Sequence, residues 1–154
     1  MKVLRILVLL CCVWPLPLAA AGSSRLSIAT ADGRDLPFTI ELAQSNDELA
    51  RGLMNRTNLS ADAGMLFDFG EDRPVFMWMK NTLIPLDMIF IGRDGIVAGI
   101  AERTVPNSLD IIASPGPVRA VLEVNGGTAD RLRIKAGDRV GYPLFRLNSP
   151  AEGR

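Results

Sequence analysis

Apolar and polar side chains alternate along much of the sequence after residue 24, which is the pattern of strands with one buried face. Two alternating runs, 25–31 and 36–42, are separated by Asp32-Gly33, and this arrangement predicts a β-hairpin. Further strands are predicted at 64–69, 75–79, 86–91, 96–101, 118–124 and 139–147. The pattern therefore predicts a chain that is mostly sheet.

Two connections stand out between these strands. Asp94-Gly95 separates the runs 86–91 and 96–101, and this dipeptide predicts a second hairpin with a type I′ turn. The stretch 104–118 contains three prolines and no regular period. A loop of this length inside a compact domain is usually functional or mobile.

Helical spacing is confined to two short segments. Ser45 and Glu48 have the spacing of a capping box ahead of apolar positions at helical intervals, which predicts the main helix at about 46–56. Thr128 is predicted to cap a short helix that ends at about residue 133. The combination predicts an α+β fold, as a single mostly antiparallel β domain that curls toward a barrel.

The ends of the chain differ from this central part. Lys2 and Arg5 precede an apolar stretch at 6–18, and small residues follow at 19–22. This order predicts a signal peptide at 1–21, cleaved after Ala20 or Ala21, and hence an exported, periplasmic protein. We expect a single domain at 22–147 and a disordered tail at 148–154. No later run reaches the roughly 18 apolar residues of a membrane helix, so no membrane span is expected in the mature protein.

The composition without residues 1–21 narrows the possible chemistry. The remaining 133 residues (154 less 21) hold neither histidine nor cysteine and have two more acidic than basic side chains. Zinc fingers, thiol nucleophiles, Ser-His-Asp triads and disulfides are thereby excluded from the mature chain. The charge balance argues against a nucleic-acid partner, which needs a basic face. No cofactor is predicted.

The segment 78–87 is the best candidate for function, because it places polar groups among apolar neighbours. A half-buried Asp87 carboxylate needs a partner, and Lys80 or Arg51 is the natural one. Such an ion pair could simply pin the turn. Alternatively, Trp78 is the apolar wall of a binding site, with Arg51 and Met54 contributed by the neighbouring helix. The predicted ligand-binding residues are Trp78, Lys80, Asn81, Asp87, Arg51 and Met54.

Catalysis is an alternative interpretation of the same residues. Lys80 together with Ser108 or Ser114 could form a Ser-Lys hydrolase if the lysine were desolvated. Two of the carboxylates Asp87, Glu102 and Glu123 could instead act as a pair on a glycan.

Copper binding is a weaker alternative that rests on the methionines. Thioethers suit Cu(I), and the mature chain has Met54, Met65, Met77, Met79 and Met88. All five occupy apolar-periodic positions, where methionine ordinarily fills the core. Core packing is therefore the favoured interpretation, and no metal site is predicted.

Several short motifs, in this order, resemble the DUF192 family (domain of unknown function 192) over about residues 26–142. They are Ala50-Arg51-Gly52-Leu53-Met54, Gly64-Met65-Leu66-Phe67, the segment 78–87, Leu122-Glu123-Val124 and the segment 134–140. The resemblance implies a small exported or membrane-proximal β-rich domain, and the activity of the family is unassigned. One departure is Met77, since the family commonly has phenylalanine before the tryptophan.

These observations together favour a non-catalytic accessory module. We expect it to bind an envelope small molecule or protein, of unknown identity, around the segment 78–87.

Overall fold

The computed structural model describes residues 24–146, so the predicted signal peptide at 1–21 and the predicted tail at 148–154 lie outside the described residues. Its elements, in chain order, are β1 (Ser24–Ala29), β2 (Asp35–Ala43), α1 (Asn46–Arg51), β3 (Ala63–Arg73), β4 (Phe76–Met77), β5 (Leu86–Ile91), β6 (Val97–Ala101), β7 (Ile112–Ala113), β8 (Val118–Asn125), α2 (Thr128–Leu132), β9 (Arg139–Gly141) and α3 (Pro143–Arg146). No helix among residues 24–146 has the length and apolar character needed to cross a membrane.

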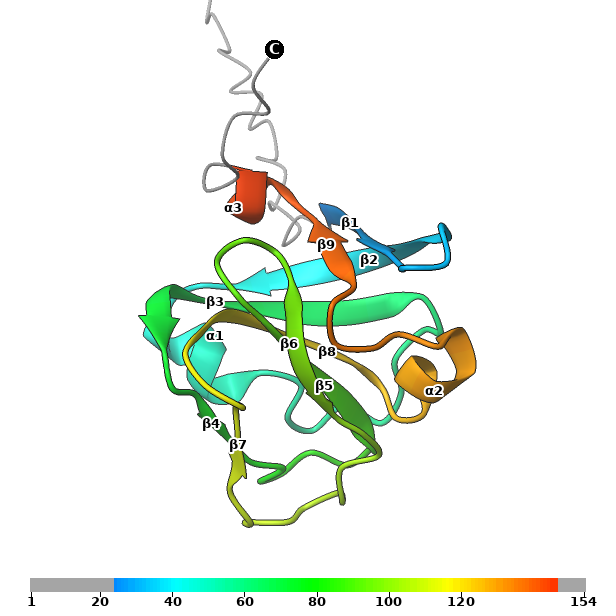
Figure 1. The fold of residues 1–154 in the computed structure, drawn as a ribbon. Helices are drawn as coiled ribbons and strands as arrows, with labels where there is room; N and C mark the ends of the chain where they lie inside the picture. The colour runs from blue at the N-terminus through cyan, green and yellow to red at the C-terminus, as the bar shows by residue number, and fades with distance from the viewer. Residues whose placement is uncertain (1–23, 147–154) are drawn as a thin grey trace, which may run out of the picture.

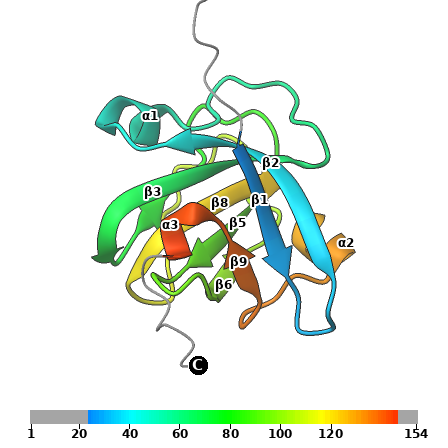
Figure 2. The same cartoon turned by 90° about the horizontal axis from the view of Figure 1, so that it is seen from above.

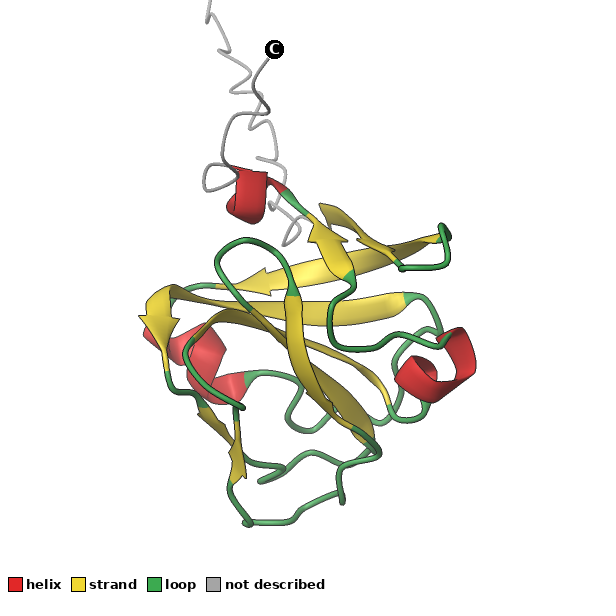
Figure 3. Ribbon diagram, in the orientation of Figure 1, coloured by secondary structure: helices red, strands yellow, loops and turns green. Residues whose placement is uncertain are grey.

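Seven strands form one sheet in the order β6-β5-β8-β3-β2-β1-β9 (Figure 1). Every neighbouring pair is antiparallel except β2 and β3, which are parallel. The two edges approach each other, because Ile96 bridges Arg139 and the Val140 N–H donates to the Gly95 carbonyl at 2.7 Å. The sheet is thus curled into a half-barrel, and the predicted α+β, mostly antiparallel fold is confirmed (Figure 3).

The sheet buries a separate apolar cluster on each of its two faces. The central strand β8 shows this, since Leu122 and Val124 belong to the cluster inside the curl, whereas Val121 packs into the cluster outside it. The inner cluster is completed by residues from β1, β2, β9 and α3. Helices α1 and α2 lie at opposite sides of the molecule (Figure 2). The outer cluster is covered by α1 and by the segments around β4 and β7.

We call residues 74–85 and 105–117 the flap. Within it, β4 and β7 form a separate two-stranded sheet, and the Met79 N–H donates to the Ser108 carbonyl at 3.1 Å. The strand predicted at 75–79 is therefore only two residues long, and the stretch 104–118 contains its partner β7. The predicted strand shortens because it pairs with this proline-bounded segment and not with the main sheet.

Most predicted elements are confirmed, including both hairpins and the helix at 128–132. The type I′ turn predicted at Asp94-Gly95 is wrong. Gly95 has a positive φ of 79° but Asp94 does not, and the Gly95 N–H donates to the Gly92 carbonyl. A type I′ turn needs two positive φ angles, so this is a turn around Arg93-Asp94 followed by a left-handed glycine. Similarly, Gly127 and not Thr128 is the N-cap of α2.

Three predicted boundaries are also wrong. The helix predicted at 46–56 ends at Arg51, because Gly52 leaves the helical conformation with a φ of 47°. Strand β3 continues to Arg73 through the residues between the predicted strands, with an irregular register after Asp68. The last strand, predicted at 139–147, ends at Gly141. Pro143, which has no N–H to donate to a ladder, begins the short helix α3 there.

Candidate functional site

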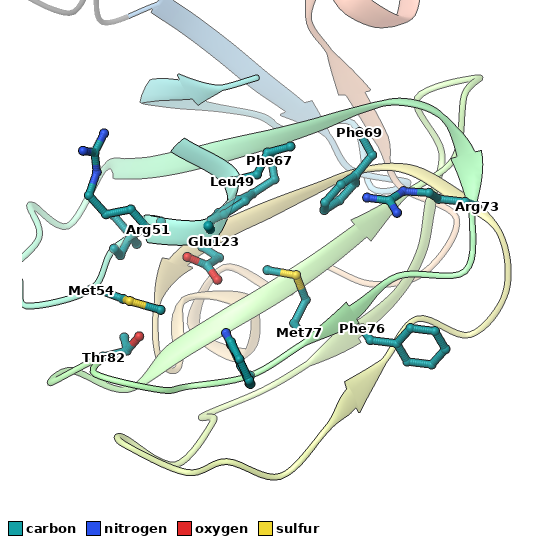
Figure 4. Close-up of a pocket in the computed structure, with 14 residues that line it drawn as sticks. Leu49, Arg51, Met54, Phe67, Phe69, Arg73, Phe76, Met77, Thr82 and Glu123 are labelled. Atoms are coloured by element: carbon teal, nitrogen blue, oxygen red, sulfur yellow. The ribbon is translucent and has the colours of Figure 1, made fainter. Parts of the chain in front are cut away.

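A pocket of about 280 Å³ lies between α1 and the flap, over the outer face of the sheet (Figure 4). Side chains from four parts of the chain line it: α1 and the turn that follows, β3, the flap, and the central strand β8. They are Leu49, Ala50, Arg51, Gly52, Leu53, Met54, Phe67, Phe69, Arg73, Phe76, Met77, Trp78, Thr82 and Glu123.

Helix α1 forms one wall because its start and end are both fixed locally. The Ser45 hydroxyl accepts a hydrogen bond from the Glu48 N–H, and the Glu48 carboxylate accepts from the Ser45 N–H at 2.9 Å, which confirms the predicted capping box. The N–H groups of Ser45 and Gln44 both donate to this carboxylate and lower the pKa of Glu48 to about 2.

Gly52 ends the helix and allows a close approach to the sheet. A Cβ atom at this position would lie 2.8 Å from the Phe67 ring and 3.9 Å from a Glu123 carboxyl oxygen. A residue other than glycine would thus be strained twice, by its positive φ and by the Phe67 ring. The glycine therefore brings the end of α1 directly over Phe67 and Glu123.

Four aromatic residues contribute to the walls of the pocket. The Phe67 and Phe69 rings stack with their centroids 6.5 Å apart, and the Arg73 guanidinium lies 5.0 Å from the Phe69 centroid. On the flap, Phe76 and Trp78 keep 67% and 46% of their surface exposed, although both line the pocket. The flap side of the pocket is thus open to solvent and offers aromatic surface to a ligand.

Glu123 is the one acidic group in the pocket lining. Its direct cross-strand neighbours are Met65 on β3 and Met88 on β5, so all three side chains point to the outer face of the sheet. The residue is only 4% exposed, and no residue of 24–146 offers its carboxyl a hydrogen bond or an ion pair. Burial, with nothing to offset it, raises the pKa of Glu123 to about 8.

Three of the six predicted ligand-binding residues, Trp78, Arg51 and Met54, line this pocket together. Lys80 does not line it. Its ammonium lies 5.3 Å from the Trp78 ring centroid, and the side chain is exposed beside the same wall. Arg51 is exposed as well, and Figure 4 shows its guanidinium pointing away from Glu123.

The other two predicted residues, Asn81 and Asp87, serve the backbone. Asn81 is exposed with a positive φ of 55°, and its carbonyl accepts a hydrogen bond of 2.8 Å from the Asn55 N–H. This bond ties the flap to the turn after α1. Asp87 points to the inner face of the sheet, away from the pocket, because it precedes the outward-facing Met88.

Asp87 is fully buried, and its carboxylate accepts three backbone hydrogen bonds. The donors are the N–H groups of Arg103 at 2.7 Å, Gly127 at 2.9 Å and Ala129 at 2.8 Å. The predicted ion pair with Lys80 or Arg51 is therefore wrong. The carboxylate is satisfied by two N–H groups at the start of α2 and one after β6, a meeting that cannot be seen in the sequence.

The residues considered for catalysis are not brought together. Ser108 donates to the Asp110 carboxylate and Ser114 to the Gly116 carbonyl, and no hydrogen bond in the described part of the chain joins either hydroxyl to the Lys80 ammonium. Asp87 and Glu123 lie on opposite faces of the sheet. Glu102 is exposed and lies 3.8 Å from the Arg103 guanidinium.

The methionines divide between the core and the pocket. Met65, Met79 and Met88 are buried in the outer cluster, and the Met79 sulfur accepts a hydrogen bond from the Thr104 hydroxyl at 3.1 Å. Met54 and Met77 line the pocket. The described part of the chain contains no cluster of three histidine, cysteine or acidic side chains that could hold a metal ion.

Sequence reasoning missed Glu123 as a pocket residue, together with Phe67, Phe69 and Arg73 from β3. A signal for Glu123 exists, since it is the one acidic residue in the otherwise apolar run 120–124 of a central strand. The two phenylalanines alternate along the predicted strand 64–69, which places them on one face. Their meeting with α1 depends on the tertiary fold.

Two solved structures resemble this fold closely. A protein of Sinorhizobium meliloti 1021, provisionally described as a transcription regulator, is 49% identical with a TM-score of 0.78, covering 80% of this chain and 95% of its own. A protein of unknown function from Novosphingobium aromaticivorans DSM 12444 is 40% identical with a TM-score of 0.77, covering 82% of this chain and 90% of its own. A search among curated proteins finds no match.

The family comparison agrees with the motifs in the sequence. The model of DUF192, described as "Uncharacterized ACR, COG1430", matches residues 27–142, which include β2 to β9, the second half of β1 and the whole pocket lining. The chain belongs to the DUF192 family.

Proposed function

We propose that this protein is a non-catalytic binding module whose ligand is a small molecule that enters the pocket between α1 and the flap. The environment of Glu123 carries this proposal. Its side chain is only 4% exposed, its carboxyl has no partner among residues 24–146, and it lies in a concave site whose walls include aromatic rings. A carboxyl that has no protein partner and opens onto a cavity offers a ligand a polar anchor.

The lining favours binding over catalysis. Its titratable side chains are Arg51, Arg73 and Glu123, and arginine keeps its proton in proteins. Glu123 would therefore have to act as the single acid or base, whereas hydrolysis commonly uses two such groups in defined positions. Apolar and aromatic surface together with a few polar groups is the composition of a small-ligand site.

We also propose that the module works in the periplasm. The basic residues, apolar stretch and small residues of 1–21 support export and cleavage. N-terminal sequencing of the protein from a periplasmic extract tests this part separately. The expected first residue is Ala21 or Gly22, and recovery of the uncleaved chain from the cytoplasm would contradict it.

The binding proposal is tested with a library of small aromatic and apolar compounds, followed by ligand-observed NMR on the mature protein. Trp78→Ala removes a wall of the pocket. Leu83→Ala is the matched control, because Leu83 is exposed to the same 46% on the same flap but does not line the pocket. Binding compounds should lose their signal with Trp78→Ala and keep it with Leu83→Ala. The proposal fails if no compound binds, or if both variants bind equally.

A further inference from the structure

Glu123 carries information about the chemistry of the ligand, because its carboxyl has no counter-charge in the described protein. A buried carboxylate ordinarily has a cationic or N–H partner, since desolvation otherwise costs several kcal/mol. Figure 4 shows the Glu123 carboxyl directed into the pocket, between Met54, Met77 and the end of α1. Its polar tip is therefore accessible to a ligand rather than enclosed by the core.

The elements packed around Glu123 present apolar groups to it. Strands β3 and β5 contribute Met65 and Met88 as its cross-strand neighbours, and the end of α1 contributes Gly52. The flap contributes Met77 and Thr82 to the same lining.

Arg51 and Arg73 also line the pocket, but no charged group on these elements pairs with Glu123. On α1, Glu48 is engaged in the capping box and Arg51 points away from Glu123. On β3, Arg73 lies over the Phe69 ring. On the flap, Lys80 lies over the Trp78 ring, and on β5, Asp87 faces the other side of the sheet. None of these groups perturbs the Glu123 carboxyl, whose pKa is raised by burial alone.

We propose that the ligand is a primary amine with an apolar, aromatic-sized body, and that its ammonium group becomes the counterion of Glu123. This inference rests on the proposed binding function and specifies its ligand class. The body of the amine would lie against the Trp78 ring, which keeps 46% of its surface exposed, and ammonium groups are also attracted to such aromatic faces. A volume of about 280 Å³ suits a compound with one ring and a short chain.

The proposal predicts a particular dependence on pH. Without ligand, a pKa of about 8 keeps Glu123 mostly protonated at pH 7. An ammonium ion favours the carboxylate, so its binding releases a proton, and its affinity should rise by nearly tenfold per pH unit below pH 8. Aliphatic amines stay protonated throughout this range. A neutral hydrogen-bonding ligand would instead prefer the protonated acid and weaken above pH 8.

The test compares 2-phenylethylamine with 2-phenylethanol, which has the same shape but no charge, by titration calorimetry at pH 6, 7 and 8. The amine should bind at least tenfold more tightly than the alcohol at pH 8, with an affinity that rises from pH 6. Glu123→Gln should abolish this preference. Glu102→Gln, which changes an exposed carboxyl outside the lining, should retain it.

The outcomes separate this inference from the function on which it rests. If the alcohol binds as tightly as the amine, and Trp78→Ala weakens both, the pocket is a binding site but the ammonium assignment is wrong. An amine affinity that is constant from pH 6 to 8 also overturns the assignment. If neither compound binds at millimolar concentration, the ammonium assignment is wrong. If the library screen is also negative, the proposed binding function is wrong as well. Melting curves at each pH show whether Glu123→Gln is folded.

Discussion

Asp87 and Glu123 are both buried carboxyls on neighbouring strands of one sheet, yet their surroundings are opposite. Asp87 points into the curl and accepts three backbone hydrogen bonds, whereas Glu123 points outward into a pocket and accepts none from residues 24–146. Their exposed fractions are 0% and 4%, so burial alone does not distinguish them. The supply of donors does distinguish them: Asp87 ties the backbone together, whereas Glu123 has no donor among residues 24–146.

The largest expected effect comes from removing the structural carboxyl. Asp87→Ala should lower the free energy of unfolding by about 3–5 kcal/mol, because it leaves three backbone N–H groups without an acceptor, two at the start of α2 and one after β6. Urea unfolding measures this loss. If Asp87→Ala is tolerated with a loss below about 1 kcal/mol, the contrast between the two carboxyls is wrong.

Glu123→Gln should raise the free energy of unfolding, in contrast to Asp87→Ala, and the size of this gain should depend on pH. The folded pKa of Glu123, about 8, lies above its ordinary value of 4.5, so the native protein binds the proton more tightly than the unfolded chain. The stability of the wild type should therefore fall as pH rises from about 4.5 to 8, and level off above that. Glu123→Gln removes this fall and should be more stable at pH 9 by about 2–4 kcal/mol. Urea unfolding at pH 5 and pH 9 provides the measurement, and equal differences at both pH values would contradict it.

The glycine that places α1 over Glu123 gives a third comparison. Gly52→Ala should lower the free energy of unfolding by about 2–3 kcal/mol, because the residue has a positive φ and the new Cβ would lie 2.8 Å from the Phe67 ring. Gly70→Ala is the matched control, since Gly70 also has a positive φ, of 80°, but its Cβ would meet nothing within 4 Å. Its cost should be about 1 kcal/mol. Equal melting temperatures for the two variants would show that α1 does not pack on Phe67 as described.

The smallest effect is expected from Glu48, an exposed carboxyl that does have donors. Its folded pKa, about 2, lies below the ordinary 4.5, so its contribution is complete above pH 4.5 and is lost as pH falls toward 2. This direction is opposite to that of Glu123. Glu48→Ala should therefore lower the melting temperature slightly at pH 6 and change it less at pH 2.5. A larger effect at the lower pH would contradict the capping geometry.

The sequence predicted well the elements that local pattern determines. Alternation located β1, β2, β5, β6 and β8, and the spacing of Ser45 and Glu48 located the start of α1. It failed where a neighbour in space decides the outcome. The helix ends early because Gly52 packs on Phe67, and the strand at 75–79 shortens because it pairs with Ile112–Ala113 and not with the main sheet.

The candidate site shows the same division. The sequence predicts Arg51 and Met54 on a helix beside Trp78, and all three residues line the pocket. Asp87 and Glu123 were not distinguished, because a sequence shows that an acid lies in an apolar run but not which backbone N–H groups face it. Only the register of β5 and β8 shows that the two carboxyls occupy opposite faces.

The most direct test of the central claim, that Glu123 is a buried carboxyl reserved for a ligand, is a ¹³C NMR titration of the glutamate carboxyl groups. Glu123, assigned from the resonance lost in Glu123→Gln, should titrate with a pKa near 8 in the free protein. Saturating 2-phenylethylamine should move this pKa below the physiological range. A Glu123 carboxyl that titrates near its ordinary value of 4.5 in the free protein would contradict the claim.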